Sequence, residues 1–459
     1  MSTTRTRSVA ALIAIACASA LSACSDSASG GEDAKDTGGK VTITVEGWRP
    51  GDEKATIDTV KKQAADFNKT HPGITVVPKE WQWSAETFSA QLAGNTLPTT
   101  FRVPFTDTKG LAERHQIADV TDLVNALPYA KQLNPSVLEA IKGADGKIYG
   151  LPSDVYGVGL HYNRTLFQQA GLDPDKPPTT WEQVQSYAHT ISQKTKQPGY
   201  VQMSKNNTGG WMLTTLTYAQ GGRIQTGTGT DVKATLDNPG TQAALELLKT
   251  MRWQDNSMGS NTSYDWDSIN QAFAAGKVGM YMSGSDVYNA LTTTNQIKPE
   301  QYGLAVLPMT SNPGAGILGG GSVSAVSAKA TPAQRKAAIA WTDFYRIRKM
   351  VDQSAAVADA KTLAATKQPI GTPTLPIFDK ATWDRTQSWI KPYVNVPLNH
   401  MTSFTDGVFK QQLISEPSSK TQETYGVLDS VVQKVLSDKN ADIPALLKSA
   451  NQKATTLLK

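Results

Sequence analysis

The stretch DGKIYGLPSDVYGVGLHYNRTLFQQAGLDPDKPPTTWEQV, residues 145–184, carries the clearest run of local structure signals in the chain. DGKIYGLP predicts a turn followed by a strand, and GVGLHYN predicts a second strand. TLFQQAGL then predicts a short helix that ends at Gly171, and Thr180 is placed to cap a further helix. Strands therefore alternate with helices here, which is typical of an α/β fold.

The same alternation is present on both sides of this stretch. VTITVE from Val41, ITVVPKEW from Ile74 and TTFRVPF from Thr99 predict strands, and apolar residues at helical spacing lie between the first two. Further on, SVSAVSA predicts a strand and Thr331 is placed to cap a helix that continues through residue 345. This order predicts an α/β architecture with mainly parallel sheets flanked by helices.

The N-terminus has the features of an export signal. Arg5 and Arg7 precede an apolar run at residues 9–21 that would span only ~20 Å as a helix, too short for a hydrocarbon core of roughly 30 Å. The run ends in LSAC, which resembles a bacterial lipobox whose cysteine, Cys24, is lipidated after cleavage. We expect a lipoprotein signal peptide at residues 1–23 and a flexible tether at 24–40.

Composition excludes several classes of site and partner. The two cysteines are Cys17 and Cys24, so the processed chain has none for a disulfide or a cysteine metal site. The five histidines are far apart, with no H-x-x-x-H pair, and we expect neither a metal nor a cofactor. The formal charge of +5 comes from scattered residues, without a basic run, which argues against nucleic acid as a partner.

Motifs for catalysis are weak. No G-x-S-x-G elbow is present, and the glycines at 319–321 are not followed by the Lys-Ser/Thr pair of a phosphate loop. A glycosidase needs only two suitably spaced carboxylates, so the sequence leaves open a surface-anchored glycoside-processing enzyme.

An ordered set of motifs resembles one family. Residues 145–184 contain, in order, DGK-x-YG-x-P, a strand ending in YN, LF-x-x-AGL and P-x-TW. FAAGKVGMYMSGS (273–285), YGLAVLPM (302–309), the glycine, strand and helix run at 319–345, and VPLNHMTSFTDGVF (396–409) follow. Together they resemble the extracellular solute-binding proteins of carbohydrate ABC importers, the group that includes maltose-binding protein.

The resemblance implies a two-lobed periplasmic-binding-protein-like fold of type II. Three hinge crossings should lie near residues 149–153, 305–309 and 367–373, with closure of the lobes around the ligand. The N-terminal lobe would comprise residues 41–150 and 309–368, and the C-terminal lobe 151–308 and 369–459.

Candidate ligand-binding residues follow from sugar chemistry. Sugars offer hydroxyls to carboxylates and amides, and C–H faces to aromatic rings; cleft loops follow strand ends. These criteria, with the segment in which the family places ligand contacts, select Glu46, Trp48, Glu80, Trp81, Trp83, Phe105, Asp107, Tyr156, Asn207, Trp211, Asp265, Trp266, Ser285, Gly320, Gly321, Asn399, His400 and Phe404. The tryptophans at 48, 81 and 83 could instead belong to the core, and Asp107 and Asp265 could instead cap helices.

We therefore interpret the chain as a lipid-anchored substrate-binding protein, not an enzyme. It would bind a mono- or oligosaccharide on the extracytoplasmic face of a bacterial membrane, as a monomer, and deliver it to the transmembrane subunits of an ABC permease. A quaternary amine or a peptide remains an alternative ligand, because aromatic cages also bind quaternary amines.

Overall fold

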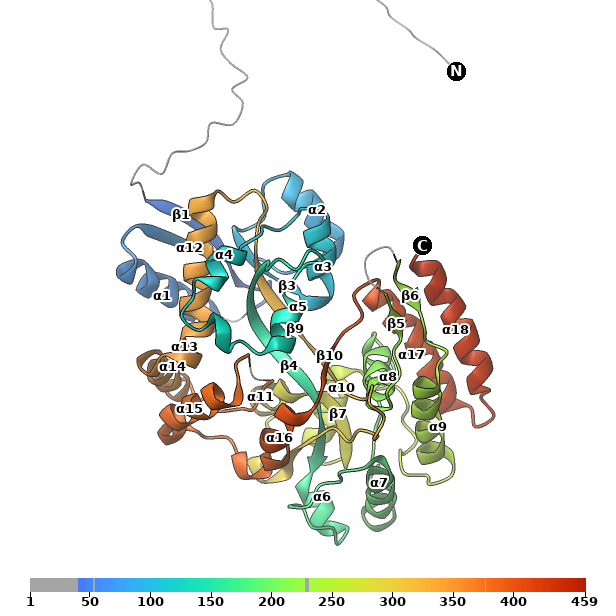
Figure 1. The fold of residues 1–459 in the computed structure, drawn as a ribbon. Coiled ribbons are helices and arrows are strands. Elements are labelled where there is room, and N and C mark those ends of the chain that lie inside the picture. Colours follow the sequence, from blue (N-terminus) through green and yellow to red (C-terminus); the bar gives the residue numbers. More distant parts are fainter. Residues whose placement is uncertain (1–39, 53, 228–230, 376) are drawn as a thin grey trace, which may run out of the picture. The chain divides into compact units, whose positions relative to one another are not determined.

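The computed structural model describes residues 40–52, 54–227, 231–375 and 377–459. Its main sheet has the strand order β2-β1-β3-β9-β4-β7, with β10 on β9 and β8 on β4 (Figure 1). The strands are β1 (Val41–Trp48), β2 (Ile74–Glu80), β3 (Thr100–Pro104), β4 (Gly150–Asn163), β7 (Met280–Gly284), β8 (Tyr302–Val306), β9 (Ile317–Val326) and β10 (Leu413–Ser415). A separate two-stranded sheet pairs β5 (Gln225–Thr226) with β6 (Lys233–Ala234).

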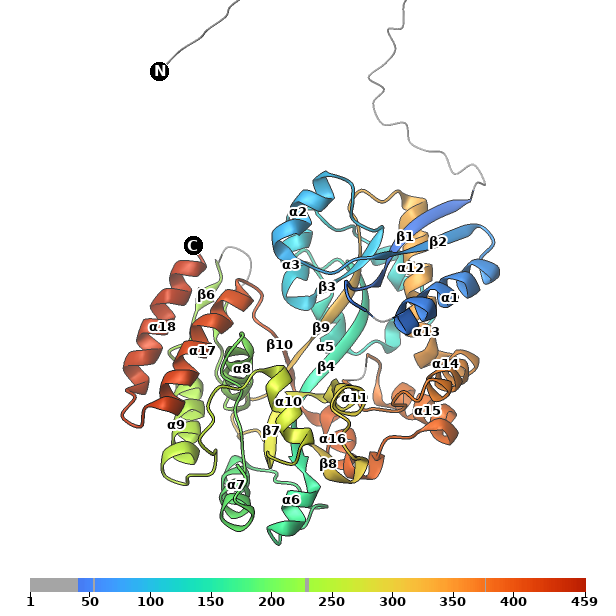
Figure 2. The same ribbon diagram turned by 180° about the vertical axis from the view of Figure 1, so that it is seen from behind.

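The first part of the described chain forms the βαβ order that the sequence predicts. The parallel strands β1, β2 and β3 alternate with α1 (Lys54–Thr70) and α2 (Ala85–Ala93), and α3 (Phe105–Glu113) follows β3 directly. Helices α1 and α12 (Pro332–Thr342) pack against β1, and α3 packs against β3 and β9. The short helices α4 (Thr121–Asn125) and α5 (Pro135–Ala140) complete this half, seen from both sides in Figures 1 and 2.

The stretch at residues 145–184 forms one long strand where the sequence predicts two. β4 runs unbroken over 14 residues, from Gly150 to Asn163. Its first half pairs with β9, and its second half pairs with β7 on one side and β8 on the other. The predicted helix and cap are confirmed: α6 (Arg164–Gln169) follows β4, and the Thr180 side chain accepts a hydrogen bond from Gln183 at the start of α7 (Trp181–Thr195).

The prediction of mainly parallel sheets is wrong, because the sheet is mixed. β4 is antiparallel to β7, β8 and β9, and β3 is antiparallel to β9. Local patterns in the sequence identify strands but not their direction, which long-range pairing decides. The α/β class and the flanking helices are confirmed.

Two strands, β4 and β9, connect the halves of the sheet. β9 starts beside β10, continues along β4, and ends beside β3. β8, which ends at Val306 inside the segment predicted as a crossing, pairs only with β4 among the described strands, and the crossing at residues 305–309 stays a prediction. The division into two lobes and their boundaries stay a prediction.

The second half of the fold is largely helical. Helices α8 (Thr208–Ala219), α9 (Pro239–Trp253), α17 (Thr421–Ser437) and α18 (Ile443–Leu457) pack on one another, and α8 also contacts β9. The remaining helices are α10 (Trp266–Ala274), α11 (Tyr288–Thr293), α13 (Arg348–Val351), α14 (Gln353–Ala365), α15 (Lys380–Ile390) and α16 (Thr402–Gly407). None of the helices in the described residues is long and apolar enough to cross a membrane.

Helix α12 shows how closely local signals match the fold. Thr331 and Gln334 form a reciprocal capping box, and Pro332 occupies the first turn, where its missing N–H has no cost. The buried stripe includes Trp341, which is 2% exposed and stacks on Tyr345, so its expected core position is confirmed. A π-helical turn at Asp343–Ile347 then joins α12 to α13.

Candidate functional site

A pocket of about 740 Å³ lies where the two halves of the fold meet. Its lining comes from the carboxyl ends of β1 and β3, from β4 and β9, and from the segments around α8, α10 and α17. In a sheet of this kind, strand ends and the loops after them present backbone and side-chain polar groups to a shared crevice. The lining residues are Glu46, Arg49, Gln82, Trp83, Arg102, Val103, Pro104, Thr106, Asp154, Tyr156, Asn206, Asn207, Thr208, Trp211, Trp266, Gly284, Asp286, Gly321, Ser322, Glu416, Gln422 and Tyr425.

Aromatic rings form one wall of this pocket. Tyr156 on β4 meets Trp211 on α8 edge to face, with ring centroids 5.8 Å apart. Tyr425 on α17 adds a third ring, and Trp83 and Trp266 contribute indoles from the two halves of the fold. Trp266 is 37% exposed, the one large hydrophobic side chain so exposed among the described residues. Partly exposed aromatic rings beside a cavity, such as those of Tyr156 and Trp211, offer flat surfaces on which a ligand's apolar face can stack.

The backbone approaches this wall closely at Gly320. A Cβ on Gly320 would clash with the Tyr156 hydroxyl and lie 2.6 Å from Glu416 Oε2. A glycine is therefore required for β9 to pass beside the aromatic wall. The sequence marks this position through the run at 319–321, but not the residues that it accommodates.

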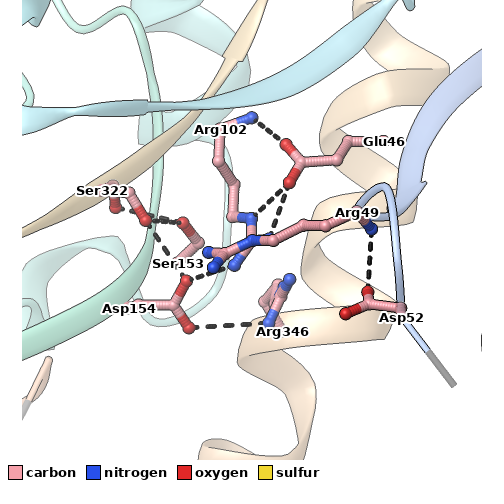
Figure 3. Close-up of polar contacts among 8 residues, drawn as sticks. All are labelled: Glu46, Arg49, Asp52, Arg102, Ser153, Asp154, Ser322 and Arg346. Carbon is pink, nitrogen blue, oxygen red and sulfur yellow. Dashed lines mark hydrogen bonds and ion pairs between the residues drawn. The ribbon is translucent and has the colours of Figure 1, made fainter. Parts of the chain in front are cut away.

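The pocket lining includes Glu46, Arg102 and Asp154, which together with Arg346 behind them form a charge cluster that we call the Arg102 cluster (Figure 3). Arg102 Nε and Nη2 donate to Glu46 Oε1 at 2.8 and 2.6 Å, and the Arg102 backbone N–H donates to Glu46 Oε2 at 2.6 Å. Arg102 Nη1 donates to Asp154 Oδ2 at 2.8 Å, and Arg346 lies 3.6 Å from Asp154 Oδ1.

Strand geometry explains why these charges meet. Glu46 and Arg102 lie near the carboxyl ends of adjacent parallel strands, β1 and β3. Asp154 follows a register irregularity between Pro152 and Asp154 in the β4–β9 pairing, and such irregularities re-aim a side chain. The Ser322 hydroxyl donates to Asp154 at 3.2 Å. The two guanidinium groups lower the pKa of the Asp154 carboxyl against the opposing effect of burial.

Two further carboxyl groups line the pocket without an ion pair among the described residues. Glu416 accepts hydrogen bonds from the Tyr425 hydroxyl at 3.0 Å and the Tyr156 hydroxyl at 3.4 Å. Burial raises the pKa of Glu416 to about 7, although these hydroxyls favour its charged form. Burial also raises the pKa of Asp286, which follows β7, and Asp154 adds to this through like-charge repulsion. Their position beside the rings places hydroxyl acceptors at the aromatic wall.

A second, larger pocket of about 1120 Å³ adjoins the first. The two pockets are neighbours, since both are lined by Trp83, Pro104, Thr106, Asn207 and Gln422. The outer part is lined mainly by α3, the loop before β4 and the start of α17. Its mixed charges and hydroxyls make it more polar than the aromatic wall.

Seven of the predicted ligand-binding residues line the inner pocket, and Asp107 lines the outer one. The seven are Glu46, Trp83, Tyr156, Asn207, Trp211, Trp266 and Gly321. Four residues lie directly beside lining residues: Phe105, Ser285, Gly320 and Asp265. Asp265 caps α10 through a capping box with Ser268, which is the structural alternative raised for it; Asp107 lies inside the first turn of α3, not at its cap.

The remaining predicted positions lie away from the inner and outer pockets, and their role in ligand binding stays a prediction. Trp81 and Phe404 are buried in the core, and Trp81 donates its indole N–H to Gln91 at 2.9 Å. Asn399 and His400 line a separate pocket beside α6 and α7. Trp48 and Glu80 line neither the inner nor the outer pocket. For Trp48, Glu80 and Trp81, a strand-end position fixes the sequence neighbourhood of a side chain but not the face it occupies. Asn399, His400 and Phe404 were chosen from the family segment, which lies in η7 (Leu398–His400) and α16 in this chain. Cys24 lies outside the described residues.

Sequence reasoning missed most of the charged lining. Arg49, Arg102, Asp154, Asp286 and Glu416 all line the inner pocket. Arg102 lies inside the strand predicted from Thr99, and Asp154 lies between the two strands predicted within residues 145–163, so the rule of taking charged residues near strand ends could have found them. Glu416 gave no such signal, since β10 has only three residues. In the described part of the chain, no group of three or more His, Cys, Asp or Glu side chains could hold a metal ion.

Comparison with known proteins identifies the family to which this geometry belongs. A family model described as bacterial extracellular solute-binding protein matches residues 62–384, which is more than half of the chain. The chain belongs to the bacterial extracellular solute-binding proteins. Members of this family bind solutes and are not enzymes, so the glycosidase alternative is set aside.

Individual relatives of this solute-binding protein differ in what they bind. The sn-glycerol-3-phosphate-binding periplasmic protein UgpB of Brucella abortus is 26% identical over 260 residues, 52% of this chain and 56% of its own length. The melibiose/raffinose/stachyose-binding protein MelE of Bacillus subtilis is 27% identical over 158 residues, 34% of each chain. The chain thus spans between about a third and just over half of the length of these curated relatives.

A solved structure shows the same fold. The cyclic α-maltosyl-1,6-maltose binding protein of Arthrobacter globiformis superposes with a TM-score of 0.70 at 19% sequence identity, covering 92% of this chain and all of that one. At this identity the likeness concerns the fold alone. It confirms the periplasmic-binding-protein-like architecture that the sequence motifs implied.

Proposed function

We propose that this solute-binding protein captures a mono- or oligosaccharide in the inner pocket and delivers it to an ABC permease. The observation that carries the proposal is the pairing of rings and acceptors in one cavity. The edge-to-face pair Tyr156 and Trp211 stands beside Glu416, and the Arg102 cluster faces the same space. Rings match the C–H faces of a sugar, and carboxylates accept its hydroxyls.

The position of the pocket supports a mechanism of closure. β4 and β9 carry residues of the pocket and connect the two halves of the sheet, so a ligand that bridges the halves favours a closed arrangement. The permease would then recognise the closed form. This route also fits the family description as extracellular solute-binding proteins.

Lipid anchoring completes the proposal. Acylation of Cys24 would hold the protein at the membrane that contains the permease, with the tether at residues 24–40 giving it reach. Two acyl chains provide stable anchoring where one is marginal.

A thermal-shift screen tests the ligand class. The purified protein is heated with each member of a panel of neutral mono- and oligosaccharides, with glycine betaine and with short peptides. We expect at least one saccharide to raise Tm in a concentration-dependent way, because a ligand that binds only the folded state stabilises it by mass action. The sugar should be recovered unchanged. A shift with betaine or peptides and with none of the saccharides would contradict the proposal.

A further inference from the structure

Arg102 has the chemistry and the position of an anion receptor. It lies near the carboxyl end of β3 in the pocket lining, and its guanidinium fork matches phosphate geometry. Since one relative of this chain is named for sn-glycerol-3-phosphate, the state of this arginine bears directly on ligand choice.

Each of the three guanidinium nitrogens of Arg102 already donates to a carboxylate, which uses three of its five side-chain N–H groups. Nε and Nη2 both donate to Glu46, and Nη1 donates to Asp154. The backbone N–H of Arg102 also donates to Glu46. The Glu46 side chain is only 8% exposed, so it cannot move to water when another anion approaches. A phosphate that displaced it would leave a buried carboxylate without its partner, which is strongly unfavourable.

Asp154 accepts the hydrogen bond from Nη1, the nitrogen of the Arg102 guanidinium that does not contact Glu46. It is fixed by three groups from other segments: Arg102, Arg346 and Ser322. Its side chain is nevertheless 52% exposed toward solvent. A ligand hydroxyl can therefore donate to Asp154 without breaking these contacts, whereas an anion would meet a carboxylate surface.

The charged groups of the pocket outside the Arg102 cluster do not reverse the preference for a neutral ligand over an anion. Two carboxylates and two guanidiniums balance within the Arg102 cluster. The other ionisable lining groups are Arg49, Asp286 and Glu416, so one further cation faces two carboxyls, of which Glu416 is partly protonated near pH 7. An anionic ligand thus has no excess positive charge to balance it at this site.

We propose that Glu46 and Asp154 are specificity residues that hold Arg102 neutralised, so that the pocket accepts uncharged saccharides and excludes phosphorylated polyols. This inference rests on the proposed function and specifies the ligand class of the same pocket. It predicts that removing the two carboxylates turns Arg102 into an anion receptor.

The test compares wild type with Glu46→Gln/Asp154→Asn by isothermal titration calorimetry, using sn-glycerol-3-phosphate and inorganic phosphate as probes. The control Asp66→Asn/Asp384→Asn removes the same formal charge from exposed helix ion pairs on α1 and α15. We expect sn-glycerol-3-phosphate to bind the pocket variant at least tenfold more tightly than wild type or the control. Added salt should weaken the new binding.

Folding is checked by Tm, and the single variant Asp154→Asn keeps the test valid if the double variant unfolds. Because Asp154 is the more exposed of the two carboxylates, its loss should preserve the fold and still give a gain of about threefold in phosphate affinity. Tight binding of sn-glycerol-3-phosphate to wild type, or a folded pocket variant without any gain, would overturn the inference.

A panel of neutral saccharides titrated into wild type separates this inference from the proposed function. Binding of a saccharide together with equally tight binding of sn-glycerol-3-phosphate would refute charge exclusion and leave saccharide capture standing. Absence of saccharide binding, together with a gain of phosphate affinity in the variant, would refute saccharide capture and leave charge exclusion standing.

Discussion

The buried carboxyl of Glu416 makes the stability of the protein depend on pH in a direction that can be worked out. Burial raises its pKa from the ordinary value of 4.5 to about 7, so the folded protein keeps this proton at pH values where the unfolded chain has lost it. The stabilisation of the folded state by this bound proton is therefore greatest below about pH 4.5 and is lost as pH rises to about 7. In Glu416→Gln this dependence disappears, since an amide does not titrate in that range.

The size of the pKa shift of Glu416 sets how much its protonation contributes to the free energy of unfolding. A change from 4.5 to about 7 corresponds to at most about 3 kcal/mol in the free energy of unfolding. The carboxyl lines a pocket and is only partly shielded from water, so we expect about 1–2 kcal/mol after solvent screening.

Urea denaturation followed by tryptophan fluorescence at pH 5 and pH 8.5 measures this effect. The free energy of unfolding of wild type minus that of Glu416→Gln should fall by about 1–2 kcal/mol between the two pH values. Glu423→Gln is the control, since Glu423 lies on α17, which follows Glu416 in the chain, is half exposed and pairs with Lys420. A wild-type-minus-Glu416→Gln difference that stays constant, or grows with pH, would refute the assignment of a buried protonated carboxyl.

Three further outcomes are expected. Trp211→Ala should weaken binding of the saccharide found by screening at least tenfold by calorimetry, whereas Trp48→Ala, outside the pocket, should leave it within twofold. Thr331→Ala removes the capping box of α12 and should lower the free energy of unfolding by about 1 kcal/mol in urea titrations; an unchanged midpoint would argue against the cap. Cys24→Ala should bind ligand as wild type does yet be released from cell membranes on fractionation, and retention would refute the lipid anchor.

Local sequence signals predicted individual elements well. The strand at Val41, the cap at Thr331 and the buried stripe through Trp341 depend on neighbours within a few residues, and all three are found in the structure. The motifs at residues 145–184 also led to the family and its fold. The direction of β4 and β9 was not predictable in this way, because their partners lie more than 90 residues away in the chain.

The candidate site was predicted only in part for a related reason. Tyr156, Trp211 and Trp266 were chosen for their ring chemistry and do line the pocket. Trp81 was chosen on the same grounds but lies in the core, since adjacent strand-end residues can face opposite sides. Arg102 could not be assigned a role, because its significance arises from Glu46, 56 residues away, and from Asp154.

A co-crystal structure with the saccharide identified by screening would show directly whether the inner pocket binds the sugar. We predict the sugar in the inner pocket, with one face against Tyr156 or Trp211 and hydroxyls donating to Asp154, Asp286 or Glu416. A saccharide bound instead in the separate pocket of Asn399 and His400, with the inner pocket free of sugar, would contradict the account.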